Sequence, residues 1–147
     1  MERSSPNRKI IAVAAGGPGL VAAGRDYPDG DADAAVWTSA DGRVWSRVPH
    51  DEAVFGGGEA QEIIAVAAGG PGLVAVGFDV SGGDLGAAVW TSADGRVWSR
   101  VPQDETVLGG GYAQIVAVAA RGPGLVAVGY GVSGGETDAA VWVSPLP

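Results

Sequence analysis

The segment AAVWTSADGRVWSRVP occupies residues 34–49 and returns letter for letter at residues 87–102. A third, shorter copy begins at Ala139 and reads AAVWVSPLP. Each full copy predicts a β-hairpin, because short runs of strand-forming residues lie on both sides of Ser-Ala-Asp-Gly. In that linker the Asp side chain can accept hydrogen bonds from the backbone ahead of it, and the Gly allows a positive φ.

A second repeated segment precedes each hairpin. Residues 10–22 recur 53 residues later at 63–75, and again after a further 52 residues at 115–127. Each copy has a Gly-Pro-Gly turn between two apolar runs, which predicts two more strands per repeat. In the first repeat the four expected strands are 10–15, 20–24, 35–38 and 44–48. The first two are apolar at successive positions, which predicts strands that are covered on both faces.

The repeat length favours an all-β fold made of β-propeller blades. Four antiparallel strands in about 40–50 residues are typical of such a blade. A solenoid or a twisted sandwich is the alternative, whereas helical repeats are disfavoured by the Gly-Pro-Gly turns. We therefore expect a single domain over residues 1–147 with eleven strands in just under three blades, at about 10–49, 63–102 and 115–147.

The hairpin linker also resembles a known motif. The stretch SADGRVW at residues 39–45 resembles the Asp-box (BNR) repeat of sialidase-like β-propellers, whose pattern is Ser-x-Asp-x-Gly-x-Thr-Trp. The spacing here is one residue shorter, Val44 stands in the place of the Thr, and Pro145 interrupts the third copy. In that family the box is a structural hairpin away from the ligand site, so the resemblance implies a fold and not an activity.

Composition and charge exclude several classes of function. The net charge of −8 makes nucleic acid an improbable partner, because phosphate binding requires clustered Lys and Arg. No apolar run reaches membrane-spanning length, and residues 1–5 show no signal peptide. The chain has no Cys, which excludes disulfides and thiolate metal sites. The absence of Cys does not indicate the cellular compartment.

Two connections differ most between the repeats, although Arg121 also replaces a Gly in the first turn of the third repeat. One joins the second and third strands, at 25–33, 78–86 and 130–138, and the other joins successive repeats, at 50–62 and 103–114. In an up-and-down blade these connections share one face, opposite the invariant turns. They hold 14 of the 17 acidic residues, which predicts an acidic loop face suited to binding or simply to solubility.

Candidate metal and catalytic residues are few. Asp29, Asp31 and Asp33 alternate like the start of a Ca²⁺ loop, but the Gly and closing Glu of such a loop are missing, which favours a plain acidic loop. His50, the single histidine, makes no metal site or base–nucleophile pair alone. We expect no metal, no cofactor and no catalytic residue.

The resemblance to sialidases implies an arginine cluster and a tyrosine nucleophile in an active member of that family. The loop face offers only Arg25 among arginines, with tyrosines at Tyr27, Tyr112 and Tyr130, so that catalytic set is not recognisable. Paired carboxylates could in principle hydrolyse glycosides. The five tryptophans fit a structural framework, with sugar stacking as the alternative; they are Trp37, Trp45, Trp90, Trp98 and Trp142.

These observations favour a non-catalytic, self-associating propeller scaffold or binding module that presents its loop face to a protein or a glycan. The alternative is a glycan-binding or glycosidase-like propeller whose site is built from loops of several blades. Fewer than three blades predict ring closure by a homo-oligomer, with a six-bladed dimer favoured over a nine-bladed trimer. Residues 1–9 are expected to pair along the third blade of the partner. A fragment of a longer array and a designed or trimmed chain remain open.

Overall fold

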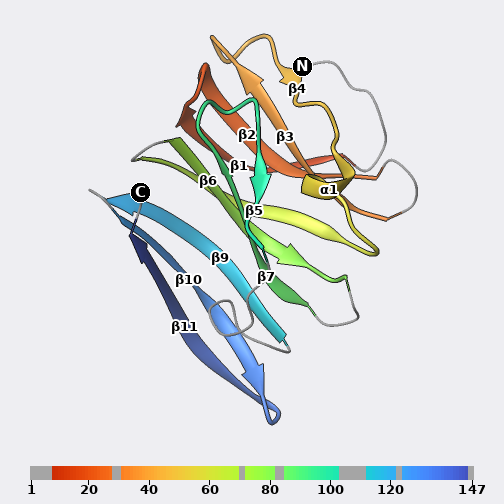
Figure 1. Cartoon of the computed structure of the whole chain (residues 1–147), viewed down its shortest axis with the longest axis vertical. Helices are drawn as coiled ribbons and strands as arrows, with labels where there is room; N and C mark the ends of the chain where they lie inside the picture. Colours follow the sequence, from red (N-terminus) through yellow and green to blue (C-terminus); the bar gives the residue numbers. More distant parts are fainter. Residues whose placement is uncertain are drawn as a thin grey trace.

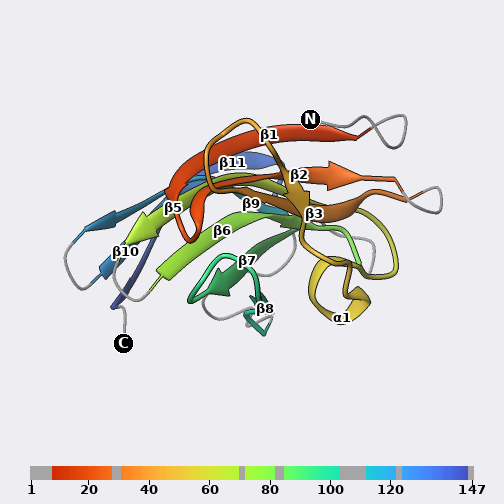
Figure 2. The ribbon, with the colours of Figure 1, turned by 90° about the horizontal axis from the view of Figure 1, so that it is seen from above.

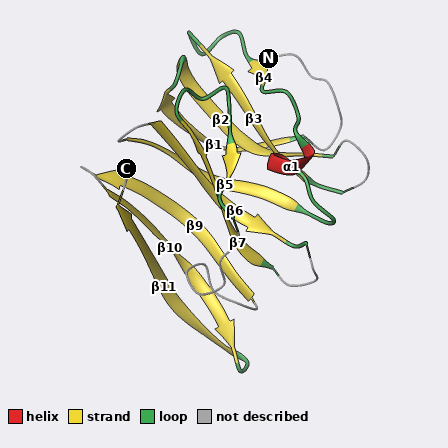
Figure 3. Cartoon of the chain, viewed as in Figure 1, coloured by secondary structure: helices red, strands yellow, loops and turns green. Residues whose placement is uncertain are grey.

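The computed structural model describes residues 8–27, 31–69, 72–81, 85–102, 112–121 and 124–145. These residues form three antiparallel sheets that fan out from one another, with one short helix (Figures 1 and 3). The all-β class is therefore confirmed. Within the described ranges, no helix combines the length and the apolar character needed to cross a membrane.

Each sheet is a simple meander in chain order. The first contains β1 (Lys9–Gly16), β2 (Gly19–Asp26), β3 (Asp33–Ser39) and β4 (Ser46–Arg47). The second contains β5 (Gln61–Gly69), β6 (Gly72–Asp79), β7 (Gly86–Ser92) and β8 (Ser99–Arg100). The third contains β9 (Tyr112–Arg121), β10 (Gly124–Ser133) and β11 (Glu136–Pro145).

The eleven strands and their grouping match the expectation from the repeats, but two details differ. The fourth strand of each repeat was predicted over five residues, whereas β4 and β8 each pair over only two. A helix that the sequence did not predict, α1 (Glu52–Phe55), lies in the connection between the first two sheets. The Asp51 side chain caps it by accepting a hydrogen bond from the backbone N–H of Ala53. The expected pairing of residues 1–9 falls mostly outside the described residues.

The sheets pack face to face, and the two faces of a sheet differ in side chains. We call one the tryptophan face; it consists of Leu73, Ala75, Ala88 and Trp90 in the second sheet. We call the other the valine face; it consists of Val74, Val76, Ala87 and Val89 there. Both faces of the second sheet are covered, since Trp90 is fully buried and Val76 is 1% exposed. The prediction of strands covered on both faces is thus confirmed for β6. It is wrong for β1, where Ile10 is 38% and Val13 62% exposed because no other sheet of the described residues packs on the outer face of the first sheet.

Both junctions between sheets join the same two kinds of face. The tryptophan face of the second sheet shares a buried cluster with the valine face of the first, which includes Val21, Ala23, Ala34 and Val36. The valine face of the second sheet shares another cluster with Leu125, Ala127 and Trp142 of the third. Strand β5 lies against the first sheet, and β9 lies against the second in the same way (Figure 2). A backbone hydrogen bond also repeats across the two junctions, from Gln61 to Ala32 and from Ala113 to Leu85.

One glycine in every sheet marks a close approach of two backbones. A β-bulge interrupts the pairing of the first two strands of each sheet, between Ile63 and Ala65 in the second. Opposite it lies Gly77, where an added Cβ would overlap the carbonyl oxygen of Glu62. Gly24 and Gly129 face the equivalent carbonyl groups, so all three sheets require glycine at this position.

We expect Gly77→Ala to lower the free energy of unfolding by about 1–3 kcal/mol, as overpacking of a well-packed site does. Gly58→Ala is the matched control, because nothing lies within 4 Å of a Cβ added there. Urea unfolding followed by tryptophan fluorescence measures both variants. Equal stability of the two would contradict the close approach at the bulge.

Candidate functional site

The two ends of the sheets carry different kinds of connection. In the first sheet, Gly16 pairs with Gly19 beside the first turn, and Asp26 pairs with Asp33 at the opposite end. Equivalent ends of the first two sheets lie side by side. Arg25 of the first sheet binds Glu62 of the second at one end, and at the other end a Cβ on Gly17 would meet the Asp94 carbonyl oxygen. We call these the loop end and the turn end.

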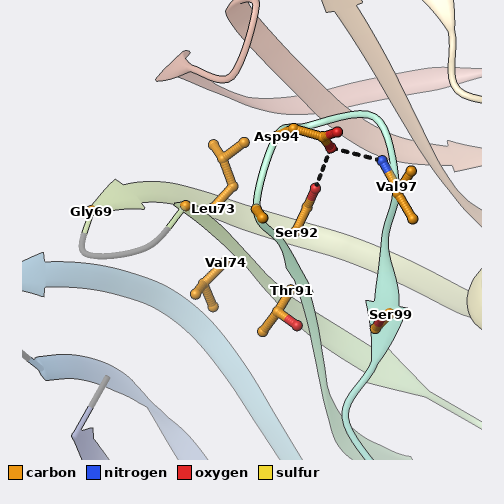
Figure 4. Close-up of a pocket in the computed structure, with 10 residues that line it drawn as sticks. Gly69, Leu73, Val74, Thr91, Ser92, Asp94, Val97 and Ser99 are labelled. Atoms are coloured by element: carbon orange, nitrogen blue, oxygen red, sulfur yellow. Dashed lines mark hydrogen bonds between the residues drawn. The ribbon is translucent and has the colours of Figure 1, made fainter. Parts of the chain in front are cut away.

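The turn end is organised by one aspartate in each of the first two sheets. Oδ1 of Asp41 accepts hydrogen bonds from the backbone N–H groups of Arg43 at 2.8 Å and Val44 at 3.1 Å. Asp94 makes the same two bonds in the second sheet, with Arg96 at 2.8 Å and with Val97 at 3.0 Å; Figure 4 shows the bond with Val97. These bonds hold the pKa of both carboxyl groups below the usual 3.8.

Glycine and tryptophan complete each turn. Gly42 and Gly95 have φ values of 83° and 82°, which only glycine adopts without strain. The Trp45 indole donates a hydrogen bond to the Gly42 carbonyl oxygen at 3.0 Å, and Trp98 does the same to Gly95 at 2.9 Å. The predicted roles of Asp and Gly in the linker are therefore confirmed, and Oδ1 of each aspartate is engaged within the turn.

Replacing both aspartates tests this assignment. We expect Asp41→Ala with Asp94→Ala to lower the melting temperature by a few degrees at pH 7, since four backbone donors lose their acceptors. Because the folded pKa of each carboxyl group lies below its unfolded value, both groups stabilise the fold above pH 3.8 and lose that effect as the pH falls through the folded pKa.

The matched control is the Asn pair at the same positions, which keeps an acceptor oxygen but cannot titrate. Melting curves from pH 7 to acid should show a smaller acid-induced loss for the Asn variant than for the parent chain. If the Ala variant melts like the parent at pH 7, these turns do not depend on the aspartates.

A guanidinium group covers the tryptophan near the loop end of the first two sheets. Arg47 lies 5.2 Å above the centre of the Trp37 ring, and its Nη1 contacts Asp26 at 2.6 Å. The second sheet repeats these contacts at 5.1 Å and 2.9 Å with Arg100, Trp90 and Asp79. A cation–π contact and an ion pair thus hold both arginines over the rings.

The acidic residues of the loop end are partly neutralised by such contacts. Glu62 binds Arg25 at 2.9 Å, which links the first two sheets. Burial alone would raise the pKa of Asp79, but hydrogen bonds from Gln61, Ser81 and Arg100 outweigh it and hold that pKa below 3.8. The net charge of −8 is thus less concentrated on this face than the sequence suggested.

The tyrosines and Arg25 do not form the arrangement that the sialidase resemblance would require. Arg25 is already paired with a carboxylate and lies 5.5 Å from the Tyr27 ring. Tyr112 and Tyr130 stack on neighbouring strands with ring centres 6.3 Å apart, and the Tyr130 hydroxyl donates to Gln114 at 2.7 Å. Burial and the nearby Tyr112 raise the pKa of Tyr130, which opposes formation of a phenolate nucleophile.

One group of potential metal ligands does assemble at the loop end. His50 Nε2 lies 3.7 Å from Asp33 and 3.1 Å from Glu52, and the three ligand atoms lie within 4.8 Å of one another. A hydrogen bond with His50 lowers the pKa of Glu52, which explains their contact without an ion. The sequence analysis missed the group because the fold, not the spacing, joins Asp33 to the connection after β4. The second repeat lacks it, with Gly86 and Gln103 at the positions of Asp33 and His50.

The three aspartates that alternate like a Ca²⁺ loop are only partly described. Asp29 lies outside the described residues, Asp31 is exposed, and the Asp33 side chain is 9% exposed and directed toward His50. We expect calorimetry to detect no Ca²⁺ site tighter than about micromolar, the range of complete Ca²⁺ loops. An Asp31→Asn variant serves as the control. Micromolar binding that this variant abolishes would establish an ion site in this segment.

Two pockets border these features. A pocket of about 410 Å³ lies at the turn end of the second sheet, between Gly69, Leu73, Thr91 and Val97 (Figure 4). Its one acidic neighbour, Asp94, is already engaged in the turn. A second pocket of about 500 Å³ adjoins α1, and its lining includes His50, Glu52, Phe55 and Trp98. Of the two, the second has titratable groups beside an apolar wall.

Comparisons with known proteins identify no relative. No protein family, no curated protein and no solved structure gives a significant match to this chain. What this chain does has to be argued from the geometry described above.

Proposed function

We infer that the three sheets are blades of an Asp-box-type β-propeller. The observation that carries this inference is the repeated junction, in which the tryptophan face of one sheet packs on the valine face of the sheet before it. A constant junction turns every sheet by a similar amount relative to its predecessor, as blades turn around a propeller axis. Close contacts of β1 with β5, and of β5 with β9, fit strands near such an axis.

The function that this arrangement supports best is a non-catalytic, self-associating scaffold that presents its loop end to a protein or a glycan. The turns are invariant and self-satisfied, whereas the loops vary on a common frame, which is the usual division between framework and binding surface. Three carboxylates near the loop end are paired with arginines, which disfavours their use as acid or base; they are Asp26, Glu62 and Asp79.

A glycan array combined with a screen of generic glycosides tests this function with the full chain. We expect no turnover of any glycoside above the buffer rate. Binding to an array member should weaken when the loop end is altered by Tyr112→Ala and stay unchanged with Thr91→Ala at the turn end. Hydrolysis by the purified chain would contradict a non-catalytic role, and binding lost only with Thr91→Ala would contradict the assigned face.

A glycosidase-like activity is the second candidate, and one observation favours it. The carboxylates of Asp33 and Glu52 lie within 4.8 Å of each other, one buried and one exposed, beside the pocket next to α1. Retaining glycosidases hold two carboxyl groups about 5–5.5 Å apart. If the screen detects hydrolysis, Glu52→Gln should abolish it while Glu59→Gln leaves it unchanged.

A further inference from the structure

Among the described residues, each of the two outer sheets has one face that no other sheet covers, and these faces are of opposite kinds. The first sheet packs its valine face on the second sheet, so no sheet covers its tryptophan face; there the ring of Trp37 is 2% exposed because Arg8 and Arg47 lie over it. The third sheet packs its tryptophan face on the second, so no sheet covers its valine face. We call these two faces open in the sense that no sheet packs on them. They are the two complementary halves of the internal junction.

The repeat provides an internal measure of the open valine face. Val126 and Val128 are 41% and 40% exposed, whereas the corresponding Val74 and Val76 of the second sheet are 4% and 1% exposed. Val141 of the third sheet is 65% exposed. The same side chains on the same strands are thus buried wherever a tryptophan face lies over them and uncovered where none does.

The open tryptophan face gives the matching comparison. Ile10 is 38% exposed, whereas the corresponding Ile63 of the second sheet is fully buried against the first sheet. Trp98 is 5% exposed and its hydrogen bond to Gly95 is buried, but the corresponding bond of Trp45 is exposed. Ile10 and the Trp45 hydrogen bond are thus more exposed than their counterparts, whereas Trp37, at 2%, is buried almost as fully as Trp90.

A polar group on this face also lacks a partner. Trp90 Nε1 donates a 2.7 Å hydrogen bond to the carbonyl oxygen of Val54, which belongs to the connection after the first sheet. The corresponding Trp37 Nε1 is buried without an acceptor in the part of the chain that the structure describes. A buried donor without an acceptor is costly, and its counterpart is satisfied from the neighbouring unit.

We propose that a second copy of this chain supplies both missing neighbours, with its first sheet on the open valine face of the third sheet and its third sheet under the open tryptophan face. The interface is head to tail and reproduces the internal junction. Two copies then close a ring of six sheets, which lies within the common propeller range, whereas three copies would give nine. The inference rests on the proposed blade arrangement, but it is tested by mass and not by ligand binding or catalysis.

Sedimentation equilibrium of the full chain, combined with three aspartate variants, tests the proposal. We expect a mass of about 29 kDa for the parent chain, twice the 14.6 kDa of one copy. Val128→Asp and Ile10→Asp should each reduce it to the mass of one copy, because each places a carboxylate in the interface. Val44→Asp is the control, since Val44 and Val97 are 73% and 74% exposed and hence insensitive to a neighbouring sheet.

The outcomes separate head-to-tail closure from other assemblies. A monomeric parent chain would overturn the proposal, and a mass of three copies would overturn closure by two. A dimer that survives Ile10→Asp but not Val128→Asp would mean that two valine faces pair with each other, which also overturns it. Circular dichroism checks that the variants fold, and Val126→Ser replaces Val128→Asp if the latter unfolds.

Discussion

The structure depends on the packing of a tryptophan-bearing face on a valine-bearing face. The central strands of the second sheet must be apolar on both sides, which explains the successive apolar positions of β6 and β7. Side chains between the first two sheets are mostly Ala and Val, and three aromatic rings, Phe55, Trp90 and Trp98, fill the space at this junction. Small side chains let backbones approach, and the aromatic rings fill the volume that remains.

This packing also explains which segments are nearly identical between the repeats. The Asp turn satisfies its own backbone, the bulge glycine permits the approach of two strands, and Arg47 covers the ring of Trp37. Each of these contacts lies within one sheet, and all three recur in the first two sheets, whereas the third sheet keeps only the bulge glycine, Gly129. The connections at the loop end are not required by any of these contacts, and they are the segments in which the repeats differ.

Local patterns predicted the parts of the fold that depend on local physics. The first three strands of each repeat, the turn role of Asp41 and the positive φ of Gly42 follow from strand and turn chemistry. Strand β4 is shorter than its alternation suggested, and the Trp45 indole in the segment just before it bonds to the Gly42 carbonyl oxygen. Arg47, an apparent surface residue, is drawn over Trp37 by a ring that belongs to another strand.

Features created by long-range contacts could not be read from the pattern. Asp33 and His50 meet because β3 begins and β4 ends at the same end of the sheet. Gly77 looked like an ordinary strand residue, since the bulge that requires it lies on the paired strand. Both depend on which backbone positions face each other, and a one-residue change of register would remove them.

Because the sheets are repeats, the exposed fractions of equivalent side chains can be compared between them. The difference indicates how much stability each sheet gains from burial. Full burial of a valine or isoleucine side chain contributes about 1.5–3 kcal/mol relative to full exposure. Val126 and Val128 realise only part of this contribution, whereas Val74 and Val76 realise almost all of it. In a repeat array, stability is approximately a sum of unit and junction terms, so an outer sheet with one junction is less stable than the middle sheet with two. Repeat proteins usually protect their outer units with polar capping faces; here Ile10 and Val128 remain apolar and exposed. In the part of the chain that the structure describes, the apolar surface of Ile10 and Val128 therefore represents junction energy that the single chain does not use.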